Sequence, residues 1–564
     1  MDAIVFGATG FIGRSLVAEL LTRGRRVAAA VREDTLTPWL ASQGIDTTRL
    51  EVVTADITRP LSGLPEARDV YNAAARYAFG LGLREARAVN VTGALHVVEW
   101  AATLPGPRRL VHISGYRVGA AVEGSPGYAT RGAYEASKTE GHLAVLDRAL
   151  ALGVPLNVVN PSTVIGPGQY LGLGSLVQDL WNGRLPAVPG GPGTFLPVVT
   201  VGHFARFLAE VPEAPAGEHY WVLDDTTPLL PELLGTVARH TGVRAPRRTV
   251  PVGLLRRLPR RVTGADPETL SFLSDDRYPT DSARALAAKA GLEMPPAADA
   301  LRTWADDLVA ARFGAASPWL RPYGFRTVAG SRTWVAGERH RPGHVLLHGL
   351  PMNADLWAPL AGLLPGPVLT ADLPGLGRSA ATERSMDAWL AGLMEPVRTR
   401  PALVAHSLAC GPALRFAVDH PDRVGELVLI APAFLQAPSP RLTRSALAVP
   451  LLRRMSAARL ARTLGAPAGP ATESAVADLR RRGAARRVVA AMRTGAAARE
   501  ESRALLDRAT VPVRIIVGSA DPLTAATGHP VTELAGAGHY PQLTHPSEVA
   551  RHLGDGAGVR AERL

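Results

Sequence analysis

The chain has 564 residues, more than one ordinary hydrophobic core accommodates, and we expect two large domains. Hydrophobic residues at 46% and charged residues at 20% indicate a globular protein. A single cysteine, Cys410, excludes a disulfide framework and a cysteine-based metal cluster, and it fits a reducing cytoplasm. There is no basic leader and no apolar run of about 18 residues, so neither export nor a membrane span is expected.

The net charge of +12 is unevenly spread. Residues 441–508 contain 15 arginines, five acidic residues and no aromatic residue. Nucleic-acid binders combine basic stripes with aromatic platforms, so nucleic acid is not an expected partner. An arginine-decorated helical surface is the simpler interpretation of such a span. The alternative is a basic surface that attracts an acyl carrier protein or another anionic acyl donor.

A strand, a glycine turn and a helix open the chain. Ile4–Phe6 is apolar, Gly7-Ala8-Thr9-Gly10-Phe11-Ile12-Gly13 follows, and an amphipathic segment runs from Phe11 to Thr22. Such glycines let the backbone approach a pyrophosphate at a helix N-terminus. The next strand runs from Arg26 to Val31 and is followed by Arg32. An arginine at this position suits the 2′-phosphate of NADP. We therefore expect NADP(H) rather than NAD(H), although Glu33 and Asp34 follow closely.

Further strands alternate with helices. Apolar strands are expected at 50–54, leading to Asp56 and Ile57, at 69–71, leading to Asn72-Ala73-Ala74-Ala75, and at 110–113, leading to Ser114. This alternation indicates a parallel, doubly wound sheet. From residue 161 to about 315 the chain is punctuated by proline and glycine. Its apolar residues there suggest a hydrophobic carbonyl substrate, while core packing is the simpler explanation for most of them.

Tyr134 and Lys138 are four residues apart, so on a helix they share one face. An ammonium close to a phenol lowers the pKa of the phenol from about 10 toward working pH. Only two residues of the chain are lysines, Lys138 and Lys289, whereas arginine is the usual cation. A lysine at this spacing therefore indicates a role for a compact, titratable charge.

These motifs resemble the extended short-chain dehydrogenase/reductase family over roughly residues 1 to 313, within it the dihydroflavonol-reductase and 3β-hydroxysteroid-dehydrogenase branch. The resemblance implies a Rossmann-type domain with Tyr134 as general acid/base, Ser114 as hydrogen-bond partner of the substrate oxygen, and Lys138 on the nicotinamide ribose. It also implies a set of cofactor-binding residues: Gly7, Thr9, Gly10, Phe11, Ile12, Gly13, Arg32, Asp56, Ile57, Ala73, Ala74, Tyr134, Lys138 and Pro161.

A second organisation begins after the small-residue and proline stretch at 314–318. Strands at 345–347, 368–370 and 402–404 lead to His348-Gly349-Leu350-Pro351, to the loop 372–379 and to Ala405-His406-Ser407-Leu408-Ala409. A serine with tiny residues two positions away on each side is typical of a strand-to-helix nucleophile turn. His406, His529, His545 and Cys410 are interpreted as structural.

The second half resembles the α/β-hydrolase family over roughly residues 320 to 555, and the chain order of nucleophile, acid and histidine agrees. The resemblance implies Ser407 as nucleophile, Asp521 as acid and His539 as base, with the Leu350 and Leu408 amides as oxyanion hole. Asp521 and His539 are only 18 residues apart, so a loop is expected to replace the helix between them.

The sequence thus predicts two enzymes in one chain: a dehydrogenase/reductase domain (1–315), a linker (316–324), an α/β-hydrolase domain (325–555, helical cap about 433–508) and a flexible tail (556–564). The first would reduce a carbonyl or oxidise the alcohol, and the second would hydrolyse an ester, thioester or lactone, both on one small metabolite. The alternative is an NAD-dependent sugar-nucleotide epimerase or dehydratase joined to a non-catalytic binding module. No metal site is predicted, and a homodimer is left open.

Overall fold

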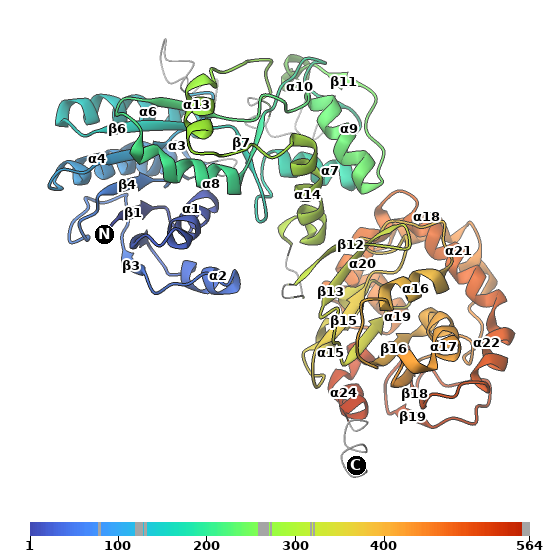
Figure 1. The fold of residues 1–564 in the computed structure, drawn as a ribbon. Coiled ribbons are helices and arrows are strands. Elements are labelled where there is room, and N and C mark those ends of the chain that lie inside the picture. Colours follow the sequence, from blue (N-terminus) through green and yellow to red (C-terminus); the bar gives the residue numbers. More distant parts are fainter. Residues whose placement is uncertain are drawn as a thin grey trace. The chain divides into compact units, whose positions relative to one another are not determined.

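The computed structural model describes residues 1–76, 81–118, 128, 132–257, 270, 273–315, 319 and 322–554. The predicted linker at 316–324 lies mostly outside these residues, and the predicted tail at 556–564 lies wholly outside them. The chain divides into two compact units, formed mainly by residues 1–308 and by the chain from residue 309 onward (Figure 1). Each unit is described by itself.

Within the described residues, the main sheet of the first unit has seven parallel strands in the order β10-β6-β5-β4-β1-β2-β3. These strands are β1 (Ala3–Phe6), β2 (Val27–Val31), β3 (Leu50–Thr54), β4 (Asp69–Asn72), β5 (Arg109–Ile113), β6 (Leu156–Pro161) and β10 (His219–Val222). The order runs outward from β1 in both directions, as in doubly wound nucleotide-binding folds. The predicted doubly wound sheet is confirmed.

Alternate residues of each central strand enter opposite cores, because successive side chains of a strand point to opposite faces. Ala3 and Val5 pack with helices α1 (Phe11–Thr22), α8 (Val201–Glu210) and α13 (Asp281–Lys289). Ile4 and Phe6 pack with α4 (Ala94–Ala102) and α6 (Ala133–Leu152). Both faces of the sheet are therefore covered, as a parallel sheet requires.

Helix α6 lies against a π-helical turn, η1 (Ala88–Gly93), which continues α3 (Leu83–Arg87) and leads into α4. A Cβ atom at Gly141 would lie 2.0 Å from the backbone oxygen of Asn90, so the two helices approach at backbone distance. Glycine at this position thus sets where α6 lies relative to the sheet.

The remaining elements of this unit are short. Two-stranded sheets pair β7 with β9 and β8 with β11. The bounds are α2 (Leu36–Ser42), β7 (Thr163–Ile165), α7 (Leu173–Trp181), β8 (Val188–Pro189), β9 (Val198–Thr200), η2 (Val211–Glu213), α9 (Leu230–Thr241), β11 (Thr249–Val250), α10 (Val252–Arg257) and α14 (Ala297–Ala310).

Among the described residues of the second unit, eight strands form one sheet in the order β12-β13-β15-β14-β16-β17-β18-β19. They are β12 (Tyr323–Val328), β13 (Ser331–Gly337), β14 (His344–Leu347), β15 (Val368–Ala371), β16 (Ala402–His406), β17 (Glu426–Ile430), β18 (Val513–Gly518) and β19 (Val531–Leu534). β13 is antiparallel to both β12 and β15, and the other pairs are parallel. The predicted α/β-hydrolase sheet is confirmed.

Helices cover both faces of this sheet, and a group of helices is inserted between β17 and β18 (Figure 1). The inserted helices, here called the cap helices, are η7 (Arg441–Arg444), α18 (Ala448–Arg454), α19 (Ala457–Leu464), α20 (Pro470–Arg480), α21 (Ala484–Ala497) and α22 (Arg499–Leu506). The other helices are η3 (Arg312–Gly314), η4 (Ala354–Trp357), α15 (Ala358–Ala361), α16 (Met386–Met394), η5 (Ser407–Ala409), α17 (Cys410–Asp419), η6 (Pro421–Arg423), α23 (Pro541–Thr544) and α24 (Pro546–Gly554).

β18 is joined to β19 by a loop without a helix, in agreement with the short spacing of Asp521 and His539. None of the described helices combines the length and the apolar character that crossing a membrane demands.

Candidate active sites

The turn between β1 and α1 can pack against its neighbours only because its key positions are glycines. Gly7 has a φ of +77°, and a Cβ atom there would lie 2.6 Å from the backbone nitrogen of Ala74. A Cβ atom at Gly13 would lie 2.1 Å from the backbone oxygen of Gly7. The turn therefore stays compact beside the end of β4, and the N–H groups of the first turn of α1 suit a pyrophosphate. These residues fit a dinucleotide.

Arg32 and Asp56 follow β2 and β3, which are neighbours in the sheet. Arg32 is exposed. Asp56 accepts hydrogen bonds from the Thr58 amide at 3.0 Å and from the Thr58 hydroxyl at 2.8 Å. These hydrogen bonds and the positive charge of Arg32 lower the pKa of the Asp56 carboxyl. Arg14 donates to the Pro167 carbonyl and lies over the Trp39 ring, so its guanidinium is already engaged.

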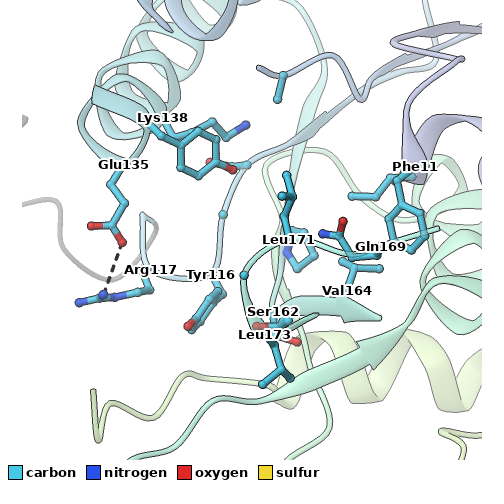
Figure 2. Close-up of a pocket in the computed structure, with 18 of the residues that line it drawn as sticks. Phe11, Tyr116, Arg117, Glu135, Lys138, Ser162, Val164, Gln169, Leu171 and Leu173 are labelled. Atoms are coloured by element: carbon cyan, nitrogen blue, oxygen red, sulfur yellow. Dashed lines mark hydrogen bonds and ion pairs between the residues drawn. The ribbon is translucent and has the colours of Figure 1, made fainter. Parts of the chain in front are cut away.

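A cavity of about 460 Å³ lies beside the carboxyl ends of β5 and β6, and its lining includes Ser114, Tyr134, Lys138 and Pro161. Much of the remaining lining is apolar, with Ser162 and Gln169 among it, and Figure 2 shows several of these side chains together with the Arg117–Glu135 ion pair of 3.4 Å. The apolar lining residues are Val164, Leu171, Leu173, Leu176, Leu196 and Leu273. The structure thus brings the predicted Ser114, Tyr134 and Lys138 to one cavity, and this cavity suits an apolar compound.

Lys138 is buried on the inner face of α6, with 6% of its surface exposed. Its ammonium donates a hydrogen bond of 3.0 Å to the Ile113 carbonyl at the end of β5. Burial disfavours the charged form and lowers the pKa of Lys138 to about 8. An arginine would stay protonated in the same place, so the lysine alone makes this charge sensitive to pH near neutrality.

Two buried residues next to this site, His142 and Asn90, were not predicted from the sequence. The Ser114 hydroxyl lies 3.1 Å from Nδ1 of His142, which is buried, and burial lowers the pKa of His142 to about 4. Asn90 donates to the Ser137 hydroxyl at 2.9 Å. His142 follows Lys138 by four residues, so helical spacing could have indicated it. Asn90 comes to α6 only through the packing of η1.

The second unit brings the predicted triad together. Nε2 of His539 lies 2.8 Å from the Ser407 hydroxyl, and Nδ1 of His539 lies 2.6 Å from Oδ2 of Asp521. Both distances correspond to hydrogen bonds. His539 as the base therefore contacts the nucleophile Ser407, and Asp521 as the acid orients His539. Ser407 has a φ of +54°, the strained conformation of a nucleophile turn.

The predicted oxyanion residues lie on the two segments that meet at Ser407. Leu408 follows Ser407 in the turn η5, before α17. Leu350 follows Gly349, where a Cβ atom would lie 2.8 Å from the Cβ of Ser407. The Tyr540 hydroxyl donates to the Leu350 carbonyl at 2.7 Å, which holds the peptide that follows the Leu350 amide.

A buried ionic network stabilises the chain that follows the Leu350 loop (residues 348–351). Arg378 donates to Asp372 at 2.7 Å and to Asp355 at 2.9 Å, and its guanidinium carbon lies 3.3 Å from the centre of the Trp334 ring. Asp372 also accepts from the Ala354 amide at 2.8 Å. Burial opposes the charge on Asp372, but Arg378 outweighs it and the pKa of Asp372 is lowered. Such a pair is strongly destabilising to break, so the loop is held firmly.

The remaining histidines considered from the sequence and Cys410 make contacts outside the triad. His406 is fully buried and lies 2.8 Å from the His539 carbonyl through Nε2. Nε2 of His529 lies 3.1 Å from the Leu506 carbonyl, and His545 contacts the Thr544 hydroxyl. Cys410 is buried, and burial raises the pKa of its thiol well above the usual value. Within the described residues, no group of His, Cys, Asp and Glu is arranged to hold a metal ion.

Several cap arginines donate to backbone carbonyls. Arg487 contacts the Gly375 carbonyl at 2.6 Å, Arg493 contacts that of Arg444 at 2.6 Å, and Arg503 contacts that of Phe434 at 2.7 Å. Arg481 contacts the Gly377 carbonyl, and Arg499 contacts those of Ala433 and Gln436. Part of the basic span thus holds the second unit together.

Comparison with known proteins agrees with this geometry. Residues 3–180 match the NAD dependent epimerase/dehydratase family, and residues 345–552 match the alpha/beta hydrolase family. The first half thus carries an epimerase/dehydratase-like domain, and the second half carries an alpha/beta hydrolase domain. The first half is accordingly a nicotinamide-cofactor-binding unit, and both halves are of enzyme families.

Three relatives illustrate the two halves. "Sterol demethylase protein B" of Methylococcus capsulatus is 28% identical over 45% of this chain and 79% of its own length. A Synechocystis protein, provisionally assigned as a dihydroflavonol 4-reductase, is 28% identical over 44% of this chain and 75% of its own length. The pimeloyl-[acyl-carrier protein] methyl ester esterase of Aromatoleum aromaticum is 31% identical over 37% of this chain and 96% of its own length.

The two lysines allow a direct test of the Lys138 environment. In protein labelled with carbon-13 at lysine Cε, we expect one resonance to titrate with a midpoint near 8, because burial lowers the pKa of Lys138 to about 8. Lys138→Arg should remove this resonance, and exposed Lys289 on α13 provides the internal reference. Two lysine midpoints both above about 10 would contradict the buried position of Lys138.

Proposed function

We propose that the chain is a bifunctional enzyme, with a carbonyl reductase or alcohol dehydrogenase in its first half and a serine hydrolase in its second. The observation that carries the proposal is that each half assembles its own set of reactive side chains. Ser114, Tyr134 and Lys138 line one cavity. Ser407, His539 and Asp521 form an unbroken hydrogen-bonded series.

In the first half, the nicotinamide when bound supplies the hydride for reduction or accepts it for oxidation. In the reducing direction the Tyr134 hydroxyl donates the proton to the carbonyl oxygen, and the Ser114 hydroxyl positions that oxygen. The charged Lys138 stabilises the phenolate that remains. In the oxidising direction Tyr134 takes the proton from the alcohol. The apolar cavity wall favours a hydrophobic carbonyl compound.

In the second half, Ser407 attacks an ester, thioester or lactone carbonyl while His539 takes its proton and Asp521 holds the imidazole. The Leu350 and Leu408 amides receive the oxyanion. The leaving alcohol or thiol takes the proton from His539, and water then hydrolyses the acyl-Ser407 ester with His539 as base. Joining both sites on one chain raises their effective concentration, which favours consecutive steps on one metabolite.

An acyl carrier protein is the proposed macromolecular partner of the cap. The relative from Aromatoleum aromaticum is named for an ester on such a carrier. On η7, on α18 and at the residue before α18, Leu442, Leu451 and Leu447 are 64%, 49% and 71% exposed, and the two helices also carry Arg441, Arg444, Arg453 and Arg454. Exposed leucines among arginines suit the acidic, partly apolar helix of a carrier.

The independence of the two sites can be tested by two substitutions. Tyr134→Phe should lower NADPH oxidation by a medium-chain aldehyde, such as octanal, roughly 10²- to 10⁴-fold, because the proton donor is lost. It should leave labelling by a fluorophosphonate probe intact. Ser407→Ala should abolish labelling and leave NADPH oxidation intact. An unlabelled wild type would refute the hydrolase and favour a binding module, and loss of both activities in either variant would show that the halves are not independent.

Cofactor content separates the reductase from an epimerase. The purified protein should carry no tightly bound NAD, and NADPH should bind more tightly than NADH by about 10-fold or more, because Arg32 offers a charge-assisted hydrogen bond to the 2′-phosphate. Arg32→Gln should remove this preference, measured by NADPH fluorescence. Arg26→Gln, an exposed arginine before β2, is the matched control. Stoichiometric retained NAD would instead support the epimerase.

The carrier surface can be tested by charge reversal. Replacing both Arg453 and Arg454 by Glu should raise KM for an acyl-carrier methyl ester about 10-fold or more, because two attractive contacts become repulsive. Hydrolysis of p-nitrophenyl butyrate should not change. Arg508→Glu, an exposed arginine after α22, is the control. An equal KM for the double variant and the wild type would rule out this surface as the docking site.

A further inference from the structure

The segment Ala433–Gln436, which leaves the sheet after β17, lies between the loop that carries Ser407 and the loop that carries Asp521. β17 is paired with β16 on one side and with β18 on the other. Ser407 follows β16 and Asp521 follows β18. Because parallel strands end at the same edge of a sheet, the chain that leaves β17 must pass between the nucleophile and the acid.

Backbone hydrogen bonds join this segment to both loops. The Ala433 amide donates to the Ser407 carbonyl at 3.3 Å. The Leu435 carbonyl accepts from the Thr524 and Ala525 amides at 2.8 and 3.1 Å. The segment is thus fixed to the nucleophile turn at one end and to the acid loop at the other.

Gln436 contacts the catalytic acid directly. Its side-chain amide donates to the Asp521 carbonyl at 3.0 Å and also to Oδ2 of the Asp521 carboxylate. Oδ2 is the same oxygen that lies 2.6 Å from His539. The Asp521 side chain is 32% exposed, so packing alone does not restrain it, whereas Gln436 is 4% exposed. Two hydrogen bonds from one buried amide therefore set the rotation of the carboxylate toward His539.

A cap arginine holds Gln436 in turn. The Arg499 guanidinium, at the start of α22, donates to the backbone carbonyls of Ala433 and Gln436. Arg503, one turn later, donates to the Phe434 carbonyl at 2.7 Å. A planar guanidinium can bridge two carbonyls of one segment, which a lysine ammonium does with less geometric control.

We propose that Gln436 positions the catalytic acid Asp521, and that Arg499 positions Gln436, so that the cap takes part in setting the geometry of the triad. The proposal rests on the hydrolase function proposed above. It gives part of the arginine-rich span a role within the protein itself, separate from any carrier.

The test uses the full chain and a fluorophosphonate probe, since no natural substrate is needed. Gln436→Leu keeps the size of the side chain and removes the donor. The second-order labelling rate should fall about 10- to 100-fold, the loss of one hydrogen bond to a charged group. The downfield proton resonance of the His539–Asp521 hydrogen bond should shift or vanish, while thermal unfolding stays close to that of the wild type.

Gln436→Glu supplies a readout that a packing role would not move. A second carboxylate beside Asp521 favours the protonated imidazolium, so the midpoint of the pH–rate profile for labelling should shift to higher pH. A wild-type profile in this variant, together with a wild-type labelling rate in Gln436→Leu, would overturn the proposal.

A double-mutant cycle tests the cap contribution. Arg499→Met should slow labelling about 3- to 10-fold and should add little to Gln436→Leu, because both substitutions interrupt the same series of contacts. Arg493→Met, which removes a contact to the Arg444 carbonyl elsewhere in the cap, should leave the rate unchanged. Losses that simply add in the double variant would remove Arg499 from the proposal.

The two levels of inference fail separately. If the wild type is not labelled but its downfield resonance changes in Gln436→Leu, the hydrolase proposal fails and the positioning of Asp521 stands. If the wild type is labelled and Gln436→Leu matches it in both rate and resonance, the hydrolase stands and the positioning of Asp521 fails.

Discussion

Parallel strands end at one edge of their sheet, and both predicted sites of this chain are built from turns at such an edge. In the first unit, Gly7 follows β1 and Ser114 follows β5, while Tyr134 and Lys138 lie on the helix after β5. In the second, Ser407 follows β16 and Asp521 follows β18. Residues far apart in the sequence thus become neighbours because the strands that precede them are neighbours.

The turns at these edges hold their shape because small residues let backbones approach. Gly7 and Gly13 keep the first turn compact against the end of β4, and Gly349 lets the Leu350 loop approach Ser407. In the second unit a buried pair, Arg378 with Asp372, holds the chain that follows the same loop, through the Ala354 amide. Glycines that allow close backbone approach and a buried ion pair therefore both help to hold the reactive groups in place.

The choice of cation follows the physical task. Arginine is used wherever a charge must bridge several oxygens, as Arg378 does between two carboxylates and Arg499 does between two carbonyls. Of the two lysines, Lys138 is the buried one, and its pKa of about 8 lets it respond to pH. An arginine there would remain charged, and its five N–H donors would need more acceptors than the ammonium that contacts the Ile113 carbonyl.

The sequence by itself determined the two folds and the reactive residue types, because strand and helix periodicity, glycine spacing and the Ser407, Asp521 and His539 order are local signals. It also located Lys138 through the scarcity of lysine. Only the tertiary structure decided which residues contact and position the reactive ones. Asn90 reaches α6 through a π-helical turn, and Gln436 contacts Asp521, which lies 85 residues further along the chain. Such contacts depend on packing between distant segments, and no spacing rule in a single sequence encodes them.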